Sequence, residues 1–242
     1  MLTYEYFESD GFSLSVECYL PKAPSGKGLL FYYGGGWIED NRHRFRRFAR
    51  NLMMQGITVF LPQYRVYGRH QVYPAAGMKD AVAGMVFAES LYQKYGIRAE
   101  EVSWGGGSAG AQLVLTGALV YPFTEKIRIW PRKMILFNPV CCPHSLSDWI
   151  IEQTGREFDF HGLCPLCEKW GESINLPRIL AMHGTMDEIA PIKDLESFAL
   201  RYRTAGGSCE IRAYPGRGHG FHHPENSEED YQDTLKAILD FL

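Results

Sequence analysis

The sequence predicts an α/β fold, with a mostly parallel central sheet, helices on both faces and a small insertion near the candidate active site. Two observations carry this prediction. Short segments that are apolar throughout alternate with longer segments of helical periodicity, as in parallel sheets that are covered on both faces. A Gly-x-Ser-x-Gly pentapeptide spans residues 106–110, between one such strand and one such helix.

Length, composition and charge limit the organisation of the chain. Its 242 residues are 45% hydrophobic and have a formal net charge of −3. A chain of this length buries roughly 70–75% of its unfolded surface around one core. We find no linker, internal repeat or low-complexity segment, and we therefore expect a single domain over residues 1–242. The mild acidity favours neither nucleic acid nor an anionic membrane as a partner.

The first half of the chain predicts a hairpin followed by alternating strands and helices. Polar and apolar residues alternate over about 3–19 around Asp10-Gly11, which indicates a β-hairpin. The elements expected next are a strand at 28–33, a helix at about 42–55, a strand at 57–61 and a helix at about 76–95.

The second half continues the alternation. Its expected elements are a strand at 101–104, a helix at 111–119, strands at 134–137, 179–182 and 210–214, a helix at about 192–204 and a C-terminal helix. Ser227 is the expected N-cap of the last helix, and Asp230, three residues later, approximates a capping box. Residues 141–175 fit neither pattern. We interpret them as a small lid-like insertion over the carboxyl edge of the sheet, where loops build sites in such folds.

Ser108 is the candidate nucleophile. The glycines on either side of its pentapeptide suit a strand-to-helix turn that leaves no room for larger side chains. A serine hydroxyl needs a base in contact and a third group that orients the base. In sheets of this type an acid and then a histidine follow, each after a later strand. Asp187 follows the strand that ends at Met182, and His219 follows the last strand.

Neighbouring residues are rivals for two of these positions. Glu188 is the alternative to Asp187, although adjacent side chains point apart. His222 and His223 follow His219 closely, but only His219 has glycines on both sides. We therefore expect Asp187 and His219 to be the partners of the serine.

Backbone N–H groups next to the nucleophile could form an oxyanion hole, often the largest single contribution to catalysis. Gly34-Gly35-Gly36-Trp37 follows an early strand, and its glycines leave the N–H groups unshielded. The amide of Ala109, one residue beyond Ser108, supplies another donor.

Together these elements resemble the hormone-sensitive-lipase-like group of α/β-hydrolases, in particular microbial acetyl esterases and carboxylesterases. The resemblance runs from about residue 28 to the C-terminus. Tyr64-Arg65, the segment 73–80 and the segment 162–166 match further landmarks of the group. The resemblance implies an α/β-hydrolase fold with Ser108 as nucleophile, His219 as general base, Asp187 as its orienting acid, and Gly35, Gly36 and Ala109 as oxyanion donors.

The sequence departs from this group at three places. The elbow ends in Ala109-Gly110-Ala111, where a second glycine is common in this group. The group's His-Gly-Gly-Gly motif reads Tyr33-Gly34-Gly35-Gly36 here. We expect no N-terminal cap of the kind that many relatives have, because the first strand signals begin almost at Met1. This last departure bears on the acyl group that the site accepts.

We therefore expect a serine hydrolase that cleaves short-chain, acetyl-like carboxylic esters through an acyl-enzyme. An amidase, formamidase or peptidase on the same residues differs only in its leaving group, which the sequence does not report. A non-catalytic binding protein on this fold is the alternative from another class, and the intact Ser108, Asp187 and His219 argue against it. Tryptophans offer stacking surfaces for a sugar ester, and the candidates are Trp37, Trp104, Trp149 and Trp170. Of these, Trp37 is the candidate substrate contact, because it directly follows the glycine loop.

Neither a cofactor nor a metal is expected. The six cysteines show no regular framework and are expected to stay reduced. A four-thiolate zinc site made by Cys141, Cys142, Cys164 and Cys167 is the alternative. No apolar run approaches the roughly 20 residues of a membrane span. The N-terminal residues lack the basic and then apolar regions of a signal peptide, so we expect a cytoplasmic protein. Nothing indicates the oligomeric state.

Overall fold

The computed structural model describes residues 1–9, 11–120, 122–171 and 175–242. Its strands form one sheet in the order β1-β2-β4-β3-β5-β6-β7-β8. They are β1 (Leu2–Ser9), β2 (Phe12–Tyr19), β3 (Gly28–Tyr32), β4 (Thr58–Pro62), β5 (Val102–Gly107), β6 (Lys133–Phe137), β7 (Arg178–Gly184) and β8 (Cys209–Tyr214). The pairs β1–β2 and β2–β4 are antiparallel, and every later pair is parallel. The predicted α/β fold with a mostly parallel sheet is confirmed.

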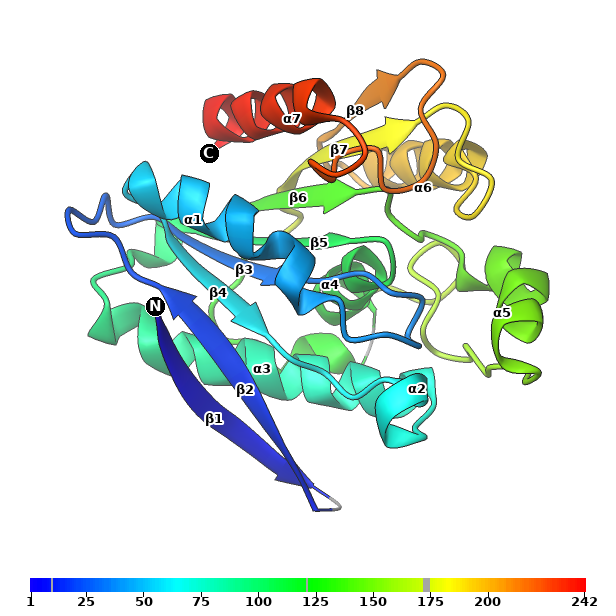
Figure 1. The fold of residues 1–242 in the computed structure, drawn as a ribbon, viewed down its shortest axis with the longest axis horizontal. Helices are drawn as coiled ribbons and strands as arrows, with labels where there is room; N and C mark the ends of the chain where they lie inside the picture. The colour runs from blue at the N-terminus through cyan, green and yellow to red at the C-terminus, as the bar shows by residue number, and fades with distance from the viewer. Residues whose placement is uncertain (10, 121, 172–174) are drawn as a thin grey trace.

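Helices cover both faces of the sheet (Figure 1). The α-helices are α1 (Arg46–Met54), α2 (Tyr67–His70), α3 (Pro74–Lys94), α4 (Ala109–Leu119), α5 (Ser147–Thr154), α6 (Ile192–Thr204) and α7 (Glu228–Phe241). Short 3-10 turns are η1 (Arg42–Phe45), η2 (Ala99–Glu101), η3 (Phe123–Lys126) and η4 (Pro143–Leu146). Helices α1 and α7 share one face, whereas α3, α4 and α6 lie on the other.

The strands are buried because both faces are covered. Every residue of β3, β4 and β5 is buried, which explains why β3 and β4 read as largely apolar runs. Helix α4 is buried along its whole length, so it shows no amphipathic stripe. Helix α1 has a clear apolar face made by Phe48, Ala49 and Leu52.

The predicted hairpin and the predicted N-cap of α7 are present, whereas β5 ends at a different residue from the one predicted. The hairpin exists as β1–β2, although Asp10 of its expected turn lies outside the described residues. Strand β5 is longer than expected and runs directly to the residue before Ser108. Ser227 caps α7 by accepting a bond from the Asp230 amide at 3.2 Å. The Asp230 carboxylate, however, pairs with Arg217 at 2.7 Å and does not complete a capping box.

The insertion contains an element that we did not predict. Residues 147–154 form α5, which begins after η4 and ends at Gly155 in the left-handed conformation, φ 65°. The expectation that residues 141–175 fit neither pattern is therefore wrong for this stretch. We call residues 141–171 the cover; the predicted insertion continues to Asn175, and residues 172–174 of it lie outside the described ranges. Helix α5 lies beyond the carboxyl ends of the strands, apart from the other helices (Figure 1).

The loops after β5, β6 and β7 at this carboxyl edge are bonded to the next strand. The Ser108 amide donates to the Phe137 carbonyl at 2.8 Å, and the Asn138 amide donates to the Met182 carbonyl at 2.9 Å. The Thr185 amide donates to the Tyr214 carbonyl at 3.0 Å. The parallel ladder thus continues one residue beyond the strands and fixes the start of each loop.

Candidate active site

Ser108 occupies a strained turn between β5 and α4. Its backbone has φ 52° and ψ −118°, a region that residues with a side chain rarely adopt. A Cβ on Gly106 would lie 2.4 Å from the Gly110 backbone, and a Cβ on Gly110 would lie 2.3 Å from the Tyr32 carbonyl oxygen. Both glycines are therefore required by close backbone approach, as the motif predicts.

The structure brings the three candidate residues together. The Ser108 Oγ lies 2.9 Å from His219 Nε2, and His219 Nδ1 lies 2.7 Å from Asp187 Oδ2. A carboxylate only accepts hydrogen bonds, so Nδ1 carries the proton and Nε2 is free to accept from the serine hydroxyl. Glu188 is exposed and takes no part in this chain of contacts among the described residues.

The Asp187 side chain is fully enclosed and holds its charge through hydrogen bonds. Its Oδ1 accepts from the amides of Ile189 and Ala190 at 3.0 and 2.9 Å. Burial opposes ionisation, but hydrogen bonds from His183 and His219 outweigh it and hold the pKa of Asp187 well below its usual range. Asp187 is therefore ionised near neutral pH.

Asn138 is a site residue that the sequence analysis missed. It follows β6 directly, and its Nδ2 donates to Asp187 Oδ2 at 2.9 Å. Its Oδ1 accepts from His222 Nδ1 at 3.1 Å. It has φ 41°, which asparagine tolerates better than most residues. A polar residue at the end of a buried strand, between the strands that lead to Ser108 and Asp187, was the available signal.

The other histidines near the site, His183, His222 and His223, are buried and contact residues of the surrounding fold. His183 lies on β7, and its Nε2 is 2.8 Å from the Ala190 carbonyl oxygen and 3.3 Å from Asp187 Oδ2. His222 stacks on Phe137 with ring centroids 4.2 Å apart. Burial lowers the pKa of His223 to about 4, so this ring is neutral near neutral pH.

The glycine loop lies against the nucleophile. A Cβ on Gly34 would lie 3.1 Å from the Ser108 Cβ. Gly35 and Gly36 have φ 130° and 60°, conformations that favour glycine. Within the described part of the chain, the amides of Gly35, Gly36 and Ala109 donate to no protein acceptor, so they are available to a bound oxyanion.

Tyr33, which stands where the group has a histidine, forms a reciprocal pair with Tyr64. Tyr33 and Tyr64 stack with ring centroids 4.6 Å apart. Each hydroxyl donates to the other residue's carbonyl oxygen at 3.1 Å. These two bonds tie the start of the glycine loop to the end of β4. Next to Tyr64, Arg65 pairs with the fully buried Asp80 at 2.9 Å, which gives Asp80 a structural partner.

A cavity of about 360 Å³ opens beside Ser108 and His219. Its wall includes the glycine loop and three residues of the cover, Leu146, Trp149 and Gln153. Trp37 is not among the lining residues. It is 2% exposed and donates from Nε1 to Gln112 Oε1 at 3.1 Å, a placement that does not support direct contact with a substrate. The tryptophan at the cavity is Trp149, whose ring would meet a Cβ on Gly36 at 2.6 Å.

Curated relatives of this chain are bacterial esterases. A carboxylic ester hydrolase, LipN, of Mycobacterium tuberculosis is 29% identical over 231 residues, which cover 82% of this chain and 59% of that protein. An acetylxylan esterase of Xylanibacter ruminicola is 23% identical over 88% of this chain and 45% of its own. The chain thus spans about half the length of these curated relatives.

Solved structures match over the whole chain. Esterase Est2 of Thermogutta terrifontis superposes with a TM-score of 0.83 at 26% identity, covering 100% of this chain and 91% of that one. The same enzyme has been solved with propionate bound and after phosphorylation by paraoxon. In the described residues of this chain, no helix combines the length and apolar character needed to cross a bilayer.

The family comparison covers most of the chain. A family model described as alpha/beta hydrolase fold matches residues 29–223, which include the glycine loop, Ser108, Asp187 and His219. The match leaves out residues 1–28, which include β1 and β2, and residues 224–242, which include α7. The chain therefore belongs to the α/β-hydrolase fold family, in its hormone-sensitive-lipase-like group.

Proposed function

We propose that this chain is a serine esterase that hydrolyses short-chain carboxylic esters. One observation carries the proposal: Ser108 Oγ, both ring nitrogens of His219 and the Asp187 carboxylate form a continuous chain of hydrogen bonds of 2.9 and 2.7 Å. This is the arrangement that nucleophilic catalysis by serine requires. The esterase names of the relatives from different bacteria support the same activity.

Acylation begins with attack of Ser108 Oγ on the ester carbonyl carbon, while the hydroxyl proton moves to His219 Nε2. Asp187 stabilises the resulting imidazolium and keeps its orientation. The negative charge on the former carbonyl oxygen would be held by the amides of Gly35, Gly36 and Ala109. Collapse of this intermediate breaks the bond to the alcohol, which leaves with the proton from His219.

Deacylation repeats the sequence with water. His219 Nε2 takes a proton from water, whose oxygen attacks the acyl carbon bonded to Ser108. Collapse returns the proton to Ser108 Oγ and releases the acid. All protons are passed through His219, and no cofactor is needed for either half of the reaction.

The size of the acyl group follows from the cavity and its cover. The cavity has a volume of about 360 Å³, which the acyl and alcohol parts of a substrate would have to share. Each methylene buried in an apolar channel contributes about 0.8 kcal/mol, whereas a methylene left in water contributes nothing. We therefore expect kcat/KM to peak from acetyl to butyryl esters and to fall beyond about six carbons.

Labelling with a fluorophosphonate, followed by rates on p-nitrophenyl esters of increasing acyl length, tests the proposal. We expect stoichiometric labelling at Ser108, hydrolysis of the acetate and butyrate esters, and slower hydrolysis of the matching anilides. Anilide rates above the ester rates would indicate an amidase. Absence of both labelling and turnover in folded protein would indicate a binding protein.

A further inference from the structure

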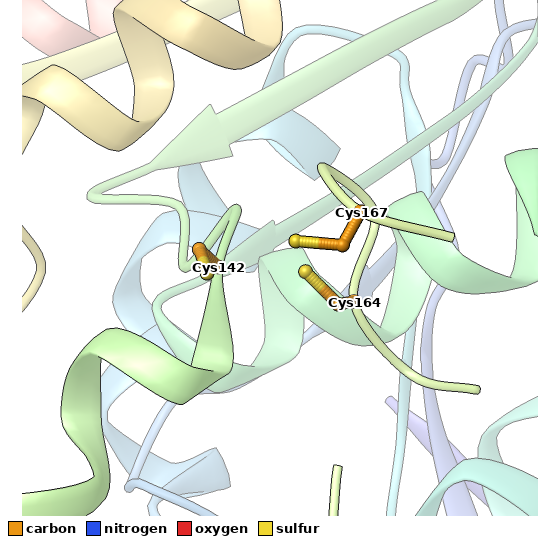
Figure 2. Close-up of side chains that lie close together, drawn as sticks. All are labelled: Cys142, Cys164 and Cys167. Carbon is orange, nitrogen blue, oxygen red and sulfur yellow. The ribbon is translucent and has the colours of Figure 1, made fainter. Parts of the chain in front are cut away.

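Three cysteines that the proposed chemistry does not use meet at the base of the cover. The Sγ atoms of Cys142, Cys164 and Cys167 all lie within 4.8 Å of one another. Figure 2 shows the side chains of Cys164 and Cys167 beside each other, facing the loop that carries Cys142. None of the three lines the cavity next to Ser108.

The spacing of the sulfur atoms suits a metal ion. Zinc binds thiolates at about 2.3 Å in a tetrahedron, which places the sulfur atoms about 3.8 Å apart. The three Sγ atoms, now within 4.8 Å, would therefore have to approach one another by at most about 1 Å. Cys167 is exposed, so solvent can reach the fourth position of the tetrahedron.

The backbone holds two of the thiols in a turn typical of structural zinc sites. Cys164 and Cys167 have the Cys-x-x-Cys spacing, and the Cys167 amide donates to the Cys164 carbonyl at 3.1 Å. The Leu166 amide donates to the Cys141 carbonyl at 3.1 Å, which joins this turn to the loop before η4. The bond to the Cys141 carbonyl places the following residue, Cys142, at the turn.

A positive charge next to the cluster compensates for thiolates. Arg201 on α6 donates to the carbonyls of Leu166 and Glu168, the latter at 2.7 Å, so its guanidinium is held by the residues on either side of Cys167. Three thiolates with a divalent cation leave one net negative charge, which this guanidinium can offset. Soft sulfur ligands select zinc or a similar thiophilic ion over magnesium or calcium.

From these observations we infer that Cys142, Cys164 and Cys167 form a three-thiolate site for Zn²⁺, with water as the fourth ligand. Binding would release the thiol protons to solvent as the three sulfur–metal bonds form. Cys141, the other candidate ligand in the sequence, is not part of the site. Its Sγ lies outside the cluster, and it contributes only its carbonyl oxygen, to Leu166 and to the Cys164 thiol.

This site would stabilise the cover by linking its first residues to its last ones. Cys142 directly precedes η4, which leads into α5 and hence to Leu146 and Trp149 in the cavity wall. Cys164 and Cys167 lie on the other half of the cover, next to α6. The metal would thus join both ends of the cover without touching Ser108 or His219.

Metal loading of the full chain under reducing conditions tests this inference. After removal of metals with a chelator, the protein is titrated with Co²⁺ and, separately, with Zn²⁺. We expect about one ion per chain and a thiolate-to-cobalt charge-transfer absorption, which reports sulfur ligands directly. Zinc at about a hundredfold excess over Kd should raise Tm by roughly 5–10 °C.

Cysteine variants locate the site. Cys164→Ser should abolish the charge-transfer band and the Tm shift, whereas Cys209→Ala, a buried cysteine outside the cluster, should keep both. Because Cys167 is exposed, Cys167→Ser is expected to fold even if Cys164→Ser does not, and it should weaken binding at least about tenfold. Fluorophosphonate labelling of Ser108 checks the fold of each variant.

Three outcomes would overturn the inference. One is the absence of a charge-transfer band in folded wild-type protein, and another is unchanged binding in folded Cys167→Ser. The third is a disulfide between Cys142 and Cys164 forming in place of metal binding under the same reducing conditions.

Discussion

The catalytic corner, made by Ser108, Asn138, Asp187 and His219, and helix α5 of the cover are held in different ways. In the corner, the single carboxylate of Asp187 accepts hydrogen bonds from Asn138, from His219 and from two backbone amides. In the described residues, the side chains of α5 form hydrogen bonds only with other residues of the cover. Ser147 donates to the His144 carbonyl, and Thr154 donates to the carbonyls of Ile150 and Arg156. Helix α5 is anchored mainly by apolar packing, with Ile150 1% exposed.

This difference separates chemistry from selectivity. Directional bonds fix the reacting atoms, and losing one of them leaves a buried charge or donor unsatisfied. Apolar packing fixes only volume and tolerates exchange of side chains of similar size. We therefore expect changes in the corner to reduce turnover for every ester, and changes in α5 to redistribute activity among esters.

The largest effect is expected from Ser108→Ala, which removes the nucleophile. Turnover of p-nitrophenyl acetate should fall roughly 10⁴–10⁶-fold, while the Tm stays close to that of the wild type. Residual activity near the wild-type level would place the nucleophile elsewhere and remove the basis of the comparison.

The next largest effect should come from Asp187→Asn. The amide would favour the wrong imidazole tautomer of His219, and kcat should fall by about 10⁴. Glu188→Gln is the matched control, because Glu188 is adjacent and exposed, and it should leave kcat nearly unchanged. The opposite ranking in steady-state rates would assign the acid to Glu188.

A smaller loss is expected from Asn138→Asp, which keeps the shape of the side chain. The donor to Asp187 becomes a second carboxylate, so kcat should fall about tenfold to a hundredfold near pH 8. Lowering the pH should recover part of the rate, because the introduced carboxyl group can again donate once it is protonated. A pH–rate profile parallel to that of the wild type would show that this bond is not used.

The smallest and most selective effect is expected from Trp149→Ala. Removing the ring enlarges the cavity next to Gly36, and each additional methylene that gains cover should raise kcat/KM about fourfold. The ratio of octanoate to butyrate hydrolysis should therefore rise. Ile151→Ala, on the exposed side of α5, is the control and should leave the ratio unchanged. Equal losses on all chain lengths would show that α5 belongs to the catalytic corner.

Features that follow from one strand or one turn could be predicted from the sequence. The elbow at Ser108 and the placement of Asp187 and His219 at strand ends depend on short-range patterns, and the structure brings these three residues together. The Gly106 and Gly110 contacts follow from the same local geometry.

Features that depend on packing between distant segments were not predicted, because a short-range pattern marks at most the position of a residue and not its partner. The role of Asn138 is visible only when β7 places Asp187 beside it. Helix α5 is short, with Trp149, Ile150 and Ile151 in succession, so it shows no helical period. The sequence likewise offers Cys141 and Cys142 equally, whereas the fold directs only Cys142 toward Cys164.

The bonds from the Ser108, Asn138 and Thr185 amides to the next strands have a consequence for partial unfolding. We expect the starts of these three loops to open only when the ladder of the central sheet opens with them. In native-state hydrogen exchange these amides should belong to the slowest class, released only by global unfolding, while the amides of α5 exchange through cheaper local openings. Heating or mild denaturant should then reduce the preference for short acyl chains at a lower temperature or denaturant concentration than the one that abolishes turnover.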